Sequence, residues 1–558
     1  MSAAERTDNT SLVPQYSFPE TLAEQKVALE SNPLLQRLHA YRKRYESDPH
    51  RPIYHYVNPE NTLNDPNGLC FWQDRWHLFY QACPPEDPRQ HWGHAISDDL
   101  IHWQDLPYAI YPNPEERCYS GAALVEEDRV IAIYHGTTVG NMVAVSHDPL
   151  LLNWEKLTGA PVIPKTSPDG SPLPYRVFDP CIWKKGDLYY ALSGSTLPHA
   201  ASGRRTRANF LFRSPNLVDW EYLHPFVEDD IFTRIGDDGA CPYFWPIGDR
   251  HILLFYSHMS GGQALLGDYE AERDKFVVTS HHDFNFGASE PGGVHAPSAT
   301  PDGKGGVYVI FNLNPAKPTT GWNQIMTLPR RLTLQGTDKI GRDTLLVEPA
   351  GDVESLRSEH RQITDMVLPA NQEIVLGSIR GNAIELIVEI ETNDAPTVEL
   401  NVLRSPGKEE FTRIAFYRER GFRDWERFEG ARQARLTAAT TSRSATESSS
   451  FPVYDPQGLS VAAADGLITI DSAYASLSSD VLSRAPETGP VFLERDEPLR
   501  LRIFVDRSVV EVFVNGRQCI AMRVYPDRED SLGVSLRSQG QDARVVSLEA
   551  WQMKNIYA

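Results

Sequence analysis

Apolar residues between positions 20 and 46 recur at helical spacing, and charged residues occupy the other face. Pro33 divides this run into two segments, because proline ends or kinks a helix. The apolar positions are Leu22, Val27, Leu29, Leu34, Leu35, Leu38 and Tyr41. The pattern therefore predicts a short N-terminal helical arm within residues 1–49, whose apolar face packs either on the main domain or on a second subunit.

From residue 50 to about 345 the pattern changes to short β-type runs separated by Pro, Gly, Asn and Asp, without helical patterns between them. The clearest runs are Leu69–Trp72, Trp76–Tyr80, Val130–His135, Leu188–Ser193, Ile252–Ser257 and Val307–Asn312. Many short strands joined by turns favour an all-β closed or radial architecture.

A degenerate element recurs within this region, in which a Ser is followed by an Asp, Asn or Pro, then Leu and, a few residues later, Trp. Its three copies are Ser97–Trp103, Ser146–Trp154 and Ser214–Trp220. Copies tens of residues apart indicate propeller blades, because each blade is a small sheet that needs neighbours to bury its faces.

The C-terminal third is predicted as a linker helix followed by a second β domain. Residues 346–365 have helical spacing at Val353 and Leu356, and short strands resume over residues 366–558. The stretch from Thr437 to Ser450 is rich in Ser and Thr and is expected to be a loop. Alternation along Leu499–Val514, followed by the hairpin dipeptide Asn515-Gly516, favours a β-sandwich.

The net charge of the chain limits the kinds of molecule that it is expected to bind. The 558 residues include 54 Lys and Arg against 75 Asp and Glu, a formal net charge of −21. Nucleic acids and anionic membranes are therefore poor candidates. The 11 Trp and 23 Tyr side chains combine apolar faces with hydrogen-bonding groups, which suits a small carbohydrate. The chain could act as a monomer or as a homo-oligomer.

The cysteines and histidines give no metal-ligand spacing. The six cysteines, Cys70, Cys83, Cys118, Cys181, Cys241 and Cys519, form no CxxC pair. They are interpreted as free thiols in a reducing compartment, and neither a metal nor a cofactor is expected. The first thirty residues lack an apolar core, so cytoplasmic localisation is expected. The residues His55, His77, His94, His102 and His295 are interpreted as structural hydrogen-bonding groups.

The sharpest chemical signal is Asn64-Asp65-Pro66-Asn67-Gly68, which alone is an ordinary turn. It is followed in order by His77–Gln81, Trp92–Ala95, Cys118–Ala122, Phe178–Pro180, Ala240–Pro242, Leu328–Arg330, Ile503–Ser508 and Glu511–Phe513. This ordered set, spanning residues 50 to 555, resembles glycoside hydrolase family 32, the β-fructofuranosidases. The resemblance implies a five-bladed β-propeller over residues 50–345 and a C-terminal β-sandwich, in agreement with the pattern.

The resemblance also implies roles for particular residues. Retaining glycosidases use two carboxyl groups, a nucleophile and an acid/base, and pass through an oxocarbenium-like transition state. Asp65 would be the nucleophile, and Asp179 would bind sugar hydroxyls and stabilise the transition state. The residues that would line the furanose pocket are Asn64, Gln81, Trp92, Tyr119, Ser120 and, at a position where the family has Arg, Phe178. Trp92 would supply an apolar floor for the sugar ring.

Three positions depart from the family pattern: Thr62 replaces Trp, Phe178 replaces Arg and Ala240 replaces the acid/base Glu. Three explanations for Ala240 remain open. The chain could be a Glu→Ala variant, it could have lost catalysis, or the acid could have moved to Asp238, which would share the face of Ala240 on a strand. Asp237 would point the other way. Arg176 lies nearby in sequence, and the sequence leaves open whether it compensates for the missing Arg.

We therefore expect a retaining glycosidase that releases β-linked fructofuranose, or a similar furanose, from sucrose-like or fructan oligosaccharides, impaired by Ala240. The alternatives are a furanoside-binding protein without turnover, and a fructosyl or arabinofuranosyl transferase that uses Asp238 as its acid. Two Gly-rich segments, His258–Gln263 and Pro291–His295, are predicted as loops at the pocket mouth.

Overall fold

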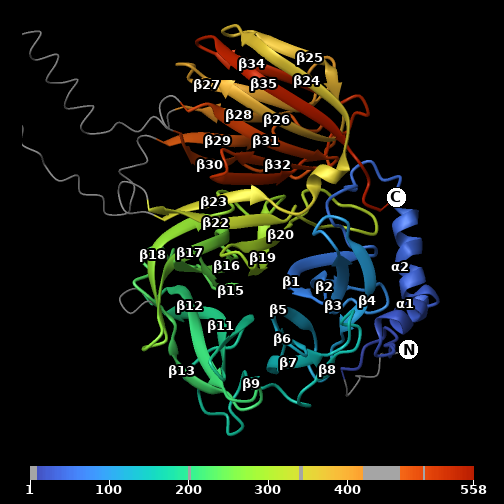
Figure 1. Cartoon of the computed structure of the whole chain (residues 1–558), viewed down its shortest axis with the longest axis vertical. Coiled ribbons are helices and arrows are strands. Elements are labelled where there is room, and N and C mark those ends of the chain that lie inside the picture. The colour runs from blue at the N-terminus through green and yellow to red at the C-terminus, as the bar shows by residue number, and fades with distance from the viewer. Residues whose placement is uncertain (1–8, 199–202, 338–342, 419–464, 494–496, 558) are drawn as a thin grey trace, which may run out of the picture.

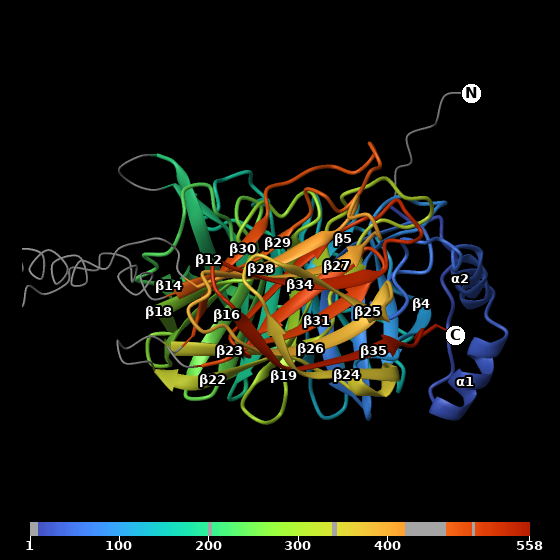
Figure 2. The same ribbon diagram turned by 90° about the horizontal axis from the view of Figure 1, so that it is seen from above.

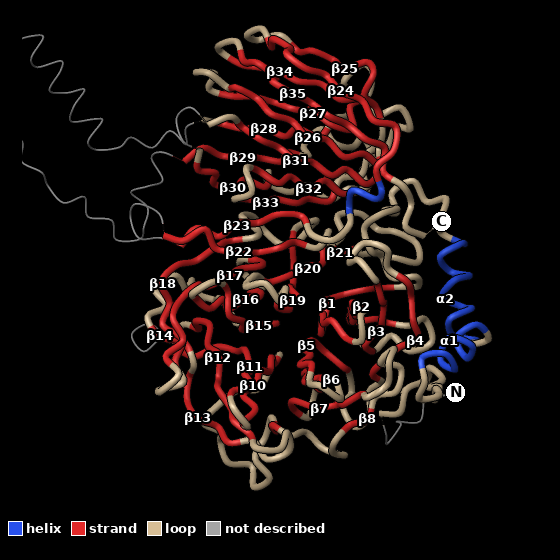
Figure 3. Tube along the Cα trace, in the orientation of Figure 1, coloured by secondary structure: helices blue, strands red, loops and turns tan. Residues whose placement is uncertain are grey.

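The computed structural model describes residues 9–198, 203–337, 343–418, 465–493 and 497–557. Strands dominate the described residues, and helix occurs in the N-terminal arm and in one short turn between the two β domains (Figure 3). Neither α1 nor α2, the two α-helices of the described part, is long and apolar enough to cross a membrane. The predicted loop at Thr437–Ser450 lies outside the described residues.

Five mainly antiparallel sheets radiate around a common axis in the described N-terminal part (Figure 1). The first contains β1 (Thr62–Trp72), β2 (Arg75–Cys83), β3 (His91–Ser97) and β4 (Gln104–Ile110). The second contains β5 (Cys118–Val125), β6 (Val130–Gly136), β7 (Gly140–Ser146), β8 (Glu155–Lys156) and β9 (Ile163–Pro164). The third contains β10 (Pro180–Lys185), β11 (Leu188–Pro198), β12 (Arg205–Ser214) and β13 (Glu221–Pro225).

The fourth sheet contains β15 (Ala240–Ile247), β16 (Arg250–Ser257), β17 (Gly261–Glu270), β18 (Lys275–Asp283) and β14 (Val227–Glu228), which pairs with β18 in parallel. The fifth contains β19 (Val294–Pro301), β20 (Val307–Leu313), β21 (Ile325–Met326), β22 (Arg330–Thr337) and β23 (Asp343–Pro349). The strands next to the axis are β1, β5, β10, β15 and β19, which pack against one another in a ring. The prediction of a five-bladed propeller is confirmed.

The recurring Ser…Leu…Trp element forms the same corner in three blades. Each copy starts at the last residue of the third strand, so it connects the third strand to the fourth. Each Ser hydroxyl donates to the Asp or Asn two residues later, whose side-chain oxygen accepts following backbone N–H groups. Leu100, Leu151 and Leu217 are buried there with φ of 70°, 51° and 70°. The sequence repeat therefore marks a repeated backbone turn.

The C-terminal domain is a sandwich of two six-stranded sheets. One sheet contains β24 (Arg357–Leu368), β35 (Ala543–Met553), β26 (Ala383–Glu391), β31 (Leu499–Asp506), β32 (Val509–Val514) and β33 (Gln518–Arg523). The other contains β25 (Glu373–Arg380), β34 (Gly533–Gln539), β27 (Thr397–Arg404), β28 (Thr412–Tyr417), β29 (Asp465–Asp471) and β30 (Glu487–Phe492). Asn515 and Gly516 both have positive φ, as the predicted hairpin turn requires.

The predicted linker helix at 346–365 is wrong. Only η1 (Val353–Leu356), a single 3₁₀ turn, is helical there, and β24 begins at Arg357. β24 is an edge strand whose side chains are mostly exposed, so its sequence lacks the alternation that marks a half-buried strand. The two buried residues of the 3₁₀ turn, Val353 and Leu356, mimicked helical spacing instead.

The arm comprises α1 (Leu22–Glu30) and α2 (Pro33–Arg44) and lies beside β4 (Figure 2). Asn32 caps α2 by accepting from Leu35 N at 3.0 Å, and Pro33 occupies its first turn. Leu34 and Leu38 are buried against blade 1 residues, so the predicted contact with the main domain is confirmed.

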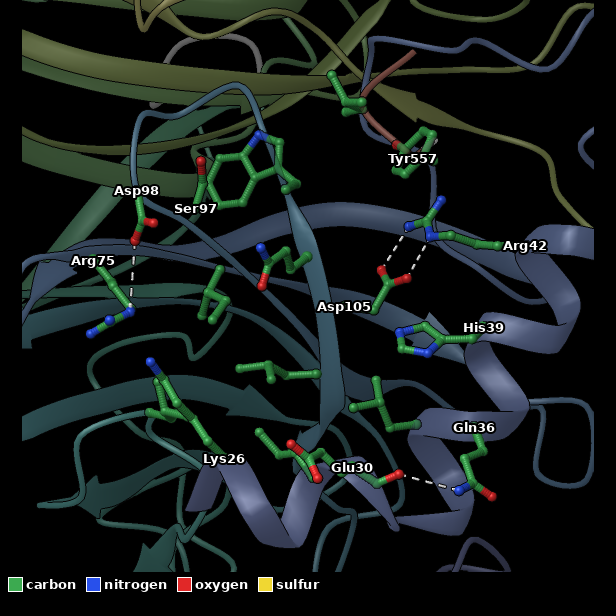
Figure 4. A pocket seen from close by; sticks show the side chains of 18 residues that line it. Lys26, Glu30, Gln36, His39, Arg42, Arg75, Ser97, Asp98, Asp105 and Tyr557 are labelled. Carbon is green, nitrogen blue, oxygen red and sulfur yellow. Dashed lines mark hydrogen bonds and ion pairs between the residues drawn. The ribbon is translucent and has the colours of Figure 1, made fainter. Parts of the chain in front are cut away.

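A groove of about 680 Å³ separates the arm from blade 1 (Figure 4). Arg42 closes one end of it by binding Asp105 through two nitrogens. None of the predicted site residues lines this groove. It is therefore a feature of the arm contact.

A buried ionic cluster joins the sandwich to the propeller; we call its four residues, His55, Arg330, Asp506 and Glu511, the interface cluster. His55 Nδ1 lies 2.9 Å from Asp506 Oδ2, and its Nε2 lies 3.1 Å from Glu511 Oε1. Arg330 Nη2 donates to Glu511 Oε2 at 2.8 Å. All four side chains are fully buried. The structural role predicted for His55 is confirmed.

Candidate active site

The candidate site lies where the innermost strands of the blades begin. Asp65 is on β1, Ser120 on β5, Cys241 on β15 and His295 on β19, while Asp179 immediately precedes β10. Cys241 Sγ lies 3.6 Å from Asp65 Oδ2 and 3.4 Å from Asp179 Oδ2. One sulfur atom thus contacts both predicted carboxylates, and all five blades contribute to one site.

Breaks in the strand register place four of these side chains in the site. Strand register breaks between Leu63 and Pro66 in β1, between Cys118 and Gly121 in β5, between Ala240 and Tyr243 in β15, and between Val294 and Pro297 in β19. Asp65, Ser120, Cys241 and His295 each lie inside such a break. A β-bulge re-aims side chains and ends regular pairing, so these four strands use the same device at the same place.

Asp65 is held as an oriented carboxylate. Its Oδ2 accepts from Ser120 Oγ at 2.5 Å and from Gln81 Nε2 at 3.0 Å, and its Oδ1 lies 3.1 Å from His295 Nδ1. Burial opposes ionisation of the carboxyl, but the hydrogen bonds and charge of His295 and the Ser120 and Cys241 hydrogen bonds outweigh it and lower the pKa of Asp65. The group is therefore an anion of fixed orientation.

Asp179 is the second buried carboxylate. Its Oδ2 accepts from the backbone N–H of Cys241 at 3.2 Å, and its Oδ1 lies 3.4 Å from His135 Nδ1. Cys241 has φ of 51°, a conformation that most residues avoid, and this turn directs its N–H toward Asp179. The start of β15 thus fixes Asp179 relative to Asp65.

The structure brings four of the predicted pocket residues together with Asp65. Gln81 and Ser120 are almost fully buried and both bind its carboxylate, so they position it. Asn64 is half-buried and accepts from Gln324 Nε2 at 3.1 Å. Tyr119 is half-buried, with its ring edge-on to His135 at 5.7 Å. Asn64 and Tyr119 remain accessible to a ligand.

Trp92 does not provide the predicted floor of a sugar pocket. Its ring is fully buried beside Phe79 and Tyr134, and its Nε1 donates to the Tyr119 carbonyl at 2.9 Å. Trp92 pairs with Gln81 but lies on the third strand of the blade, one strand farther from the axis. It supports Tyr119 from behind, and the prediction that its face contacts sugar is wrong.

Ala240 occupies an apolar position. It is 1% exposed, pairs with Tyr256 on β16, and belongs to a buried cluster with Cys241, Tyr256 and Ala296, against which Phe178 packs. Two of the departures from the family pattern, at 178 and 240, therefore contact the same cluster. Arg176 is exposed and donates to Thr196 Oγ1 at 3.5 Å, so it does not replace the missing Arg in the site.

Asp238 does not share a strand with Ala240, because β15 begins at Ala240. The expectation of a common strand face is wrong: the residues before Ala240 form a loop. Both carboxylate oxygens of Asp238 accept hydrogen bonds, from His258 Nδ1 at 2.7 Å and from His258 N at 3.2 Å. Asp237 is fully buried and accepts from Ser257 and Ser260, so its role is structural.

Sequence reasoning missed the contribution of His135 and Tyr256 to this site, and it placed His258 and His295 only within predicted loops at the pocket mouth. The sequence indicates a structural role for His295, yet His295 contacts Asp65. His295 lies near the start of an innermost strand, as Asp65 does in blade 1. His135, Tyr256 and His258 lie near or just beyond the end of a second strand, the region that Gln81 occupies in blade 1. Aligning the blades with one another was the signal that could have found them. Within the described ranges, no group of three His, Cys, Asp or Glu residues is arranged to hold a metal ion.

Comparison with known proteins matches both domains of the chain. The model of the glycosyl hydrolases family 32 N-terminal domain matches residues 55–349, and that of the family's C-terminal domain matches residues 352–552. The levanase of Bacillus subtilis (strain 168) is 25% identical over 551 residues, which cover 92% of this chain and 72% of that protein. A sucrose-6-phosphate hydrolase of Escherichia coli is 26% identical over 521 residues, 86% of this chain and 90% of that protein.

Solved structures share the fold. The crystal structure of fructan 1-exohydrolase IIa from Cichorium intybus matches with a TM-score of 0.72 at 20% sequence identity, over 91% of this chain and 98% of that chain. The β-fructofuranosidase BmSUC1 of Bombyx mori matches with a TM-score of 0.65 at 22% identity, over 95% and 99% of the two chains. The likeness thus extends over the propeller and the sandwich together.

Proposed function

Since the chain belongs to glycosyl hydrolases family 32 and is a glycosidase, we propose that it is a retaining hydrolase of terminal β-linked fructofuranosides in sucrose-like or fructan oligosaccharides. The names of its relatives, levanase, sucrose-6-phosphate hydrolase and fructan exohydrolase, support this class of substrate. A buried, ionised and oriented Asp65 is the observation that carries the proposal.

In this mechanism Asp65 Oδ1 or Oδ2 attacks the anomeric carbon and forms a fructosyl ester, which water then hydrolyses. The donors around Asp65 keep it ionised and aimed. Asp179 accepts sugar hydroxyl hydrogen bonds, and its charge favours the cationic character of the transition state. Cys241, which contacts both carboxylates, sets their separation.

The apolar contact between Phe178 and the cluster that contains Ala240 helps to distinguish the explanations for the absence of the acid/base Glu at position 240. Family members have Arg and Glu at these positions, and this chain has Phe and Ala, packed on one cluster. A single Glu→Ala change would leave the Arg in place. The paired replacement therefore supports a natural rearrangement of the site over a one-residue inactivation.

Turnover tests the proposal directly. The purified chain should be assayed with sucrose, 1-kestose, levan oligosaccharides and p-nitrophenyl β-D-fructofuranoside, in buffer that contains dilute methanol. Retention predicts that methyl β-D-fructofuranoside forms beside fructose, as followed by NMR. Tight binding of these sugars in calorimetry without turnover would instead favour a binding protein, and products longer than the substrate would favour a transferase.

We expect Ala240→Glu alone to give no gain in sucrose turnover. The new side chain would enter a filled apolar cluster beside Phe178, where overpacking costs about 1–3 kcal/mol and burial raises a carboxyl pKa. Urea unfolding and kcat/KM measure the two effects. Ala240→Gln is the matched control, because Gln has the size of Glu without its charge. A gain of several orders of magnitude with Ala240→Glu would show that position 240 still accepts the acid.

We also propose a cytoplasmic location. All six cysteines are free, and five of them are buried. Unpaired cysteines suit a reducing compartment.

A further inference from the structure

A bonded pair, Asp238 and His258, stands at the rim of the candidate site. Asp238 belongs to the loop before β15, and His258 follows the end of β16. The Asp238 carboxylate binds both the Nδ1 and the backbone N–H of His258, at 2.7 and 3.2 Å. The Nδ1 contact orients the imidazole, the backbone N–H contact fixes the Asp238 carboxylate beside it, and the His258 side chain stays 58% exposed.

Asp238 and His258 extend the pairing between β15 and β16, the strand pair that contains position 240, where the family has its acid/base Glu. Ala240 on β15 pairs with Tyr256 on β16, and Asp238 meets His258 two residues farther along both chains. The Tyr256 ring lies 5.0 Å from the His258 ring and 4.0 Å from the His295 ring, between centroids. His295 in turn contacts Asp65. The Tyr256 ring therefore lies between His258 and His295, the residue that contacts the predicted nucleophile Asp65.

The charges around His258 favour its protonated form. Its hydrogen bond to Asp238 raises its pKa above the ordinary value, partial burial opposes this, and the charges of Asp238, Asp179 and Asp65 add to the rise. The other titratable neighbours are Tyr256 and His295. Among the described residues, no hydrogen bond engages His258 Nε2, so this atom is free to donate a proton outward.

We propose that His258 is the acid/base of this enzyme and that Asp238 is its positioning residue; this rests on the proposed function. As Asp65 forms its bond to the anomeric carbon and the glycosidic C–O bond breaks, the Nε2 proton passes to the leaving oxygen. Neutral His258 then takes a proton from the water that hydrolyses the fructosyl ester, which restores both groups. The acid predicted at Asp238 is thus moved to its partner, because both Asp238 oxygens already accept hydrogen bonds.

The test compares leaving groups. For His258→Gln, we expect kcat/KM on sucrose to fall by about 10² to 10⁴-fold, the usual worth of general acid–base catalysis. With p-nitrophenyl β-D-fructofuranoside, whose leaving group needs no acid, we expect a burst followed by slow turnover. Sodium azide, which attacks without a general base, should restore turnover and give the β-fructosyl azide.

The matched control is His102→Gln. His102 is 44% exposed and its Nδ1 also binds an aspartate, Asp99, but it lies in the corner between β3 and β4 of blade 1. We expect its activity and melting temperature to equal those of the unmodified chain. The exposed His258 side chain should likewise be replaceable without a change in melting temperature.

Asp238→Asn gives a second, independent readout. Removal of its charge lowers the pKa of His258, so the alkaline limb of the kcat/KM profile should move to lower pH with KM little changed. Two outcomes would exclude His258 as the acid/base in a chain that hydrolyses sucrose. His258→Gln could keep its sucrose activity within threefold, or it could lose activity on both substrates equally without azide rescue. In either case the proposed function stands. If the unmodified chain cleaves neither substrate, the proposed function itself fails.

Discussion

Asp65→Asn is expected to lower kcat/KM by roughly 10⁴-fold or more, for sucrose and for the aryl fructofuranoside alike. An amide cannot form the fructosyl ester, and it removes the negative charge that faces the developing cation. An activated leaving group should not restore the rate, because the missing nucleophile is needed for every substrate. Loss of the general acid, by contrast, should affect an activated substrate much less than sucrose. Initial rates on both substrates, measured with one enzyme preparation, check the expectation.

Asp65→Asn keeps the size of the side chain, so circular dichroism should match that of the unmodified chain. The donors around Asp65 favour its ionised form, so the melting temperature should fall when the charge is removed. Asp169→Asn, on an exposed loop, is the control for a carboxylate outside the site. Aryl turnover that survives Asp65→Asn would place the nucleophile elsewhere.

Glu511→Gln is expected to destabilise the chain by about 3–5 kcal/mol, the cost of breaking a buried ion pair by removing one partner. Glu511 binds Arg330 and His55 and also accepts from Leu328 N at 2.7 Å, all without contact with water. Its neutral form leaves the Arg330 charge uncompensated between the domains. Equilibrium unfolding in urea measures the loss, and the exposed Glu359→Gln is the control. An unchanged midpoint would contradict this assignment.

The same cluster predicts a pH dependence of stability. Burial opposes protonation of His55, but its hydrogen bonds to Asp506 and Glu511 outweigh burial and raise its pKa to about 9. A raised pKa stabilises the fold fully below the unfolded value of about 6.5, and this contribution is lost as pH rises through 9. Urea midpoints should therefore fall between pH 6.5 and 9.5 in the unmodified chain. In His55→Gln this fall should be smaller.

Much of the fold followed from the sequence because turns and strands leave local signals. The Ser…Leu…Trp corners carry side-chain hydrogen bonds and a positive φ at Leu, which restrict the residues there. The edge strand β24 carried no such signal, since a mostly exposed strand needs no alternating apolar face. Its polar stretch was therefore mistaken for helix.

The site was predictable in part. Asp65 and Asp179 stand in recognisable motifs, and both carboxylates contact Cys241 Sγ in the folded chain. Trp92 was misjudged because distance from the propeller axis depends on which strand of the blade a residue occupies, which a motif does not record. His258 was missed for a related reason: its partner Asp238 is twenty residues away, and only strand pairing brings them together.

The register breaks at the starts of β1, β5, β15 and β19 bear on how such a site changes during evolution. Residues inside a bulge have no directly opposite partner on the next strand, so their side chains make fewer cross-strand contacts than those of paired residues. Exchanging them should therefore disturb the blade less than exchanging a paired residue such as Ala240, which lies opposite Tyr256. The propeller can thus change side chains at the reaction centre at a smaller cost in stability than at the paired positions beside it.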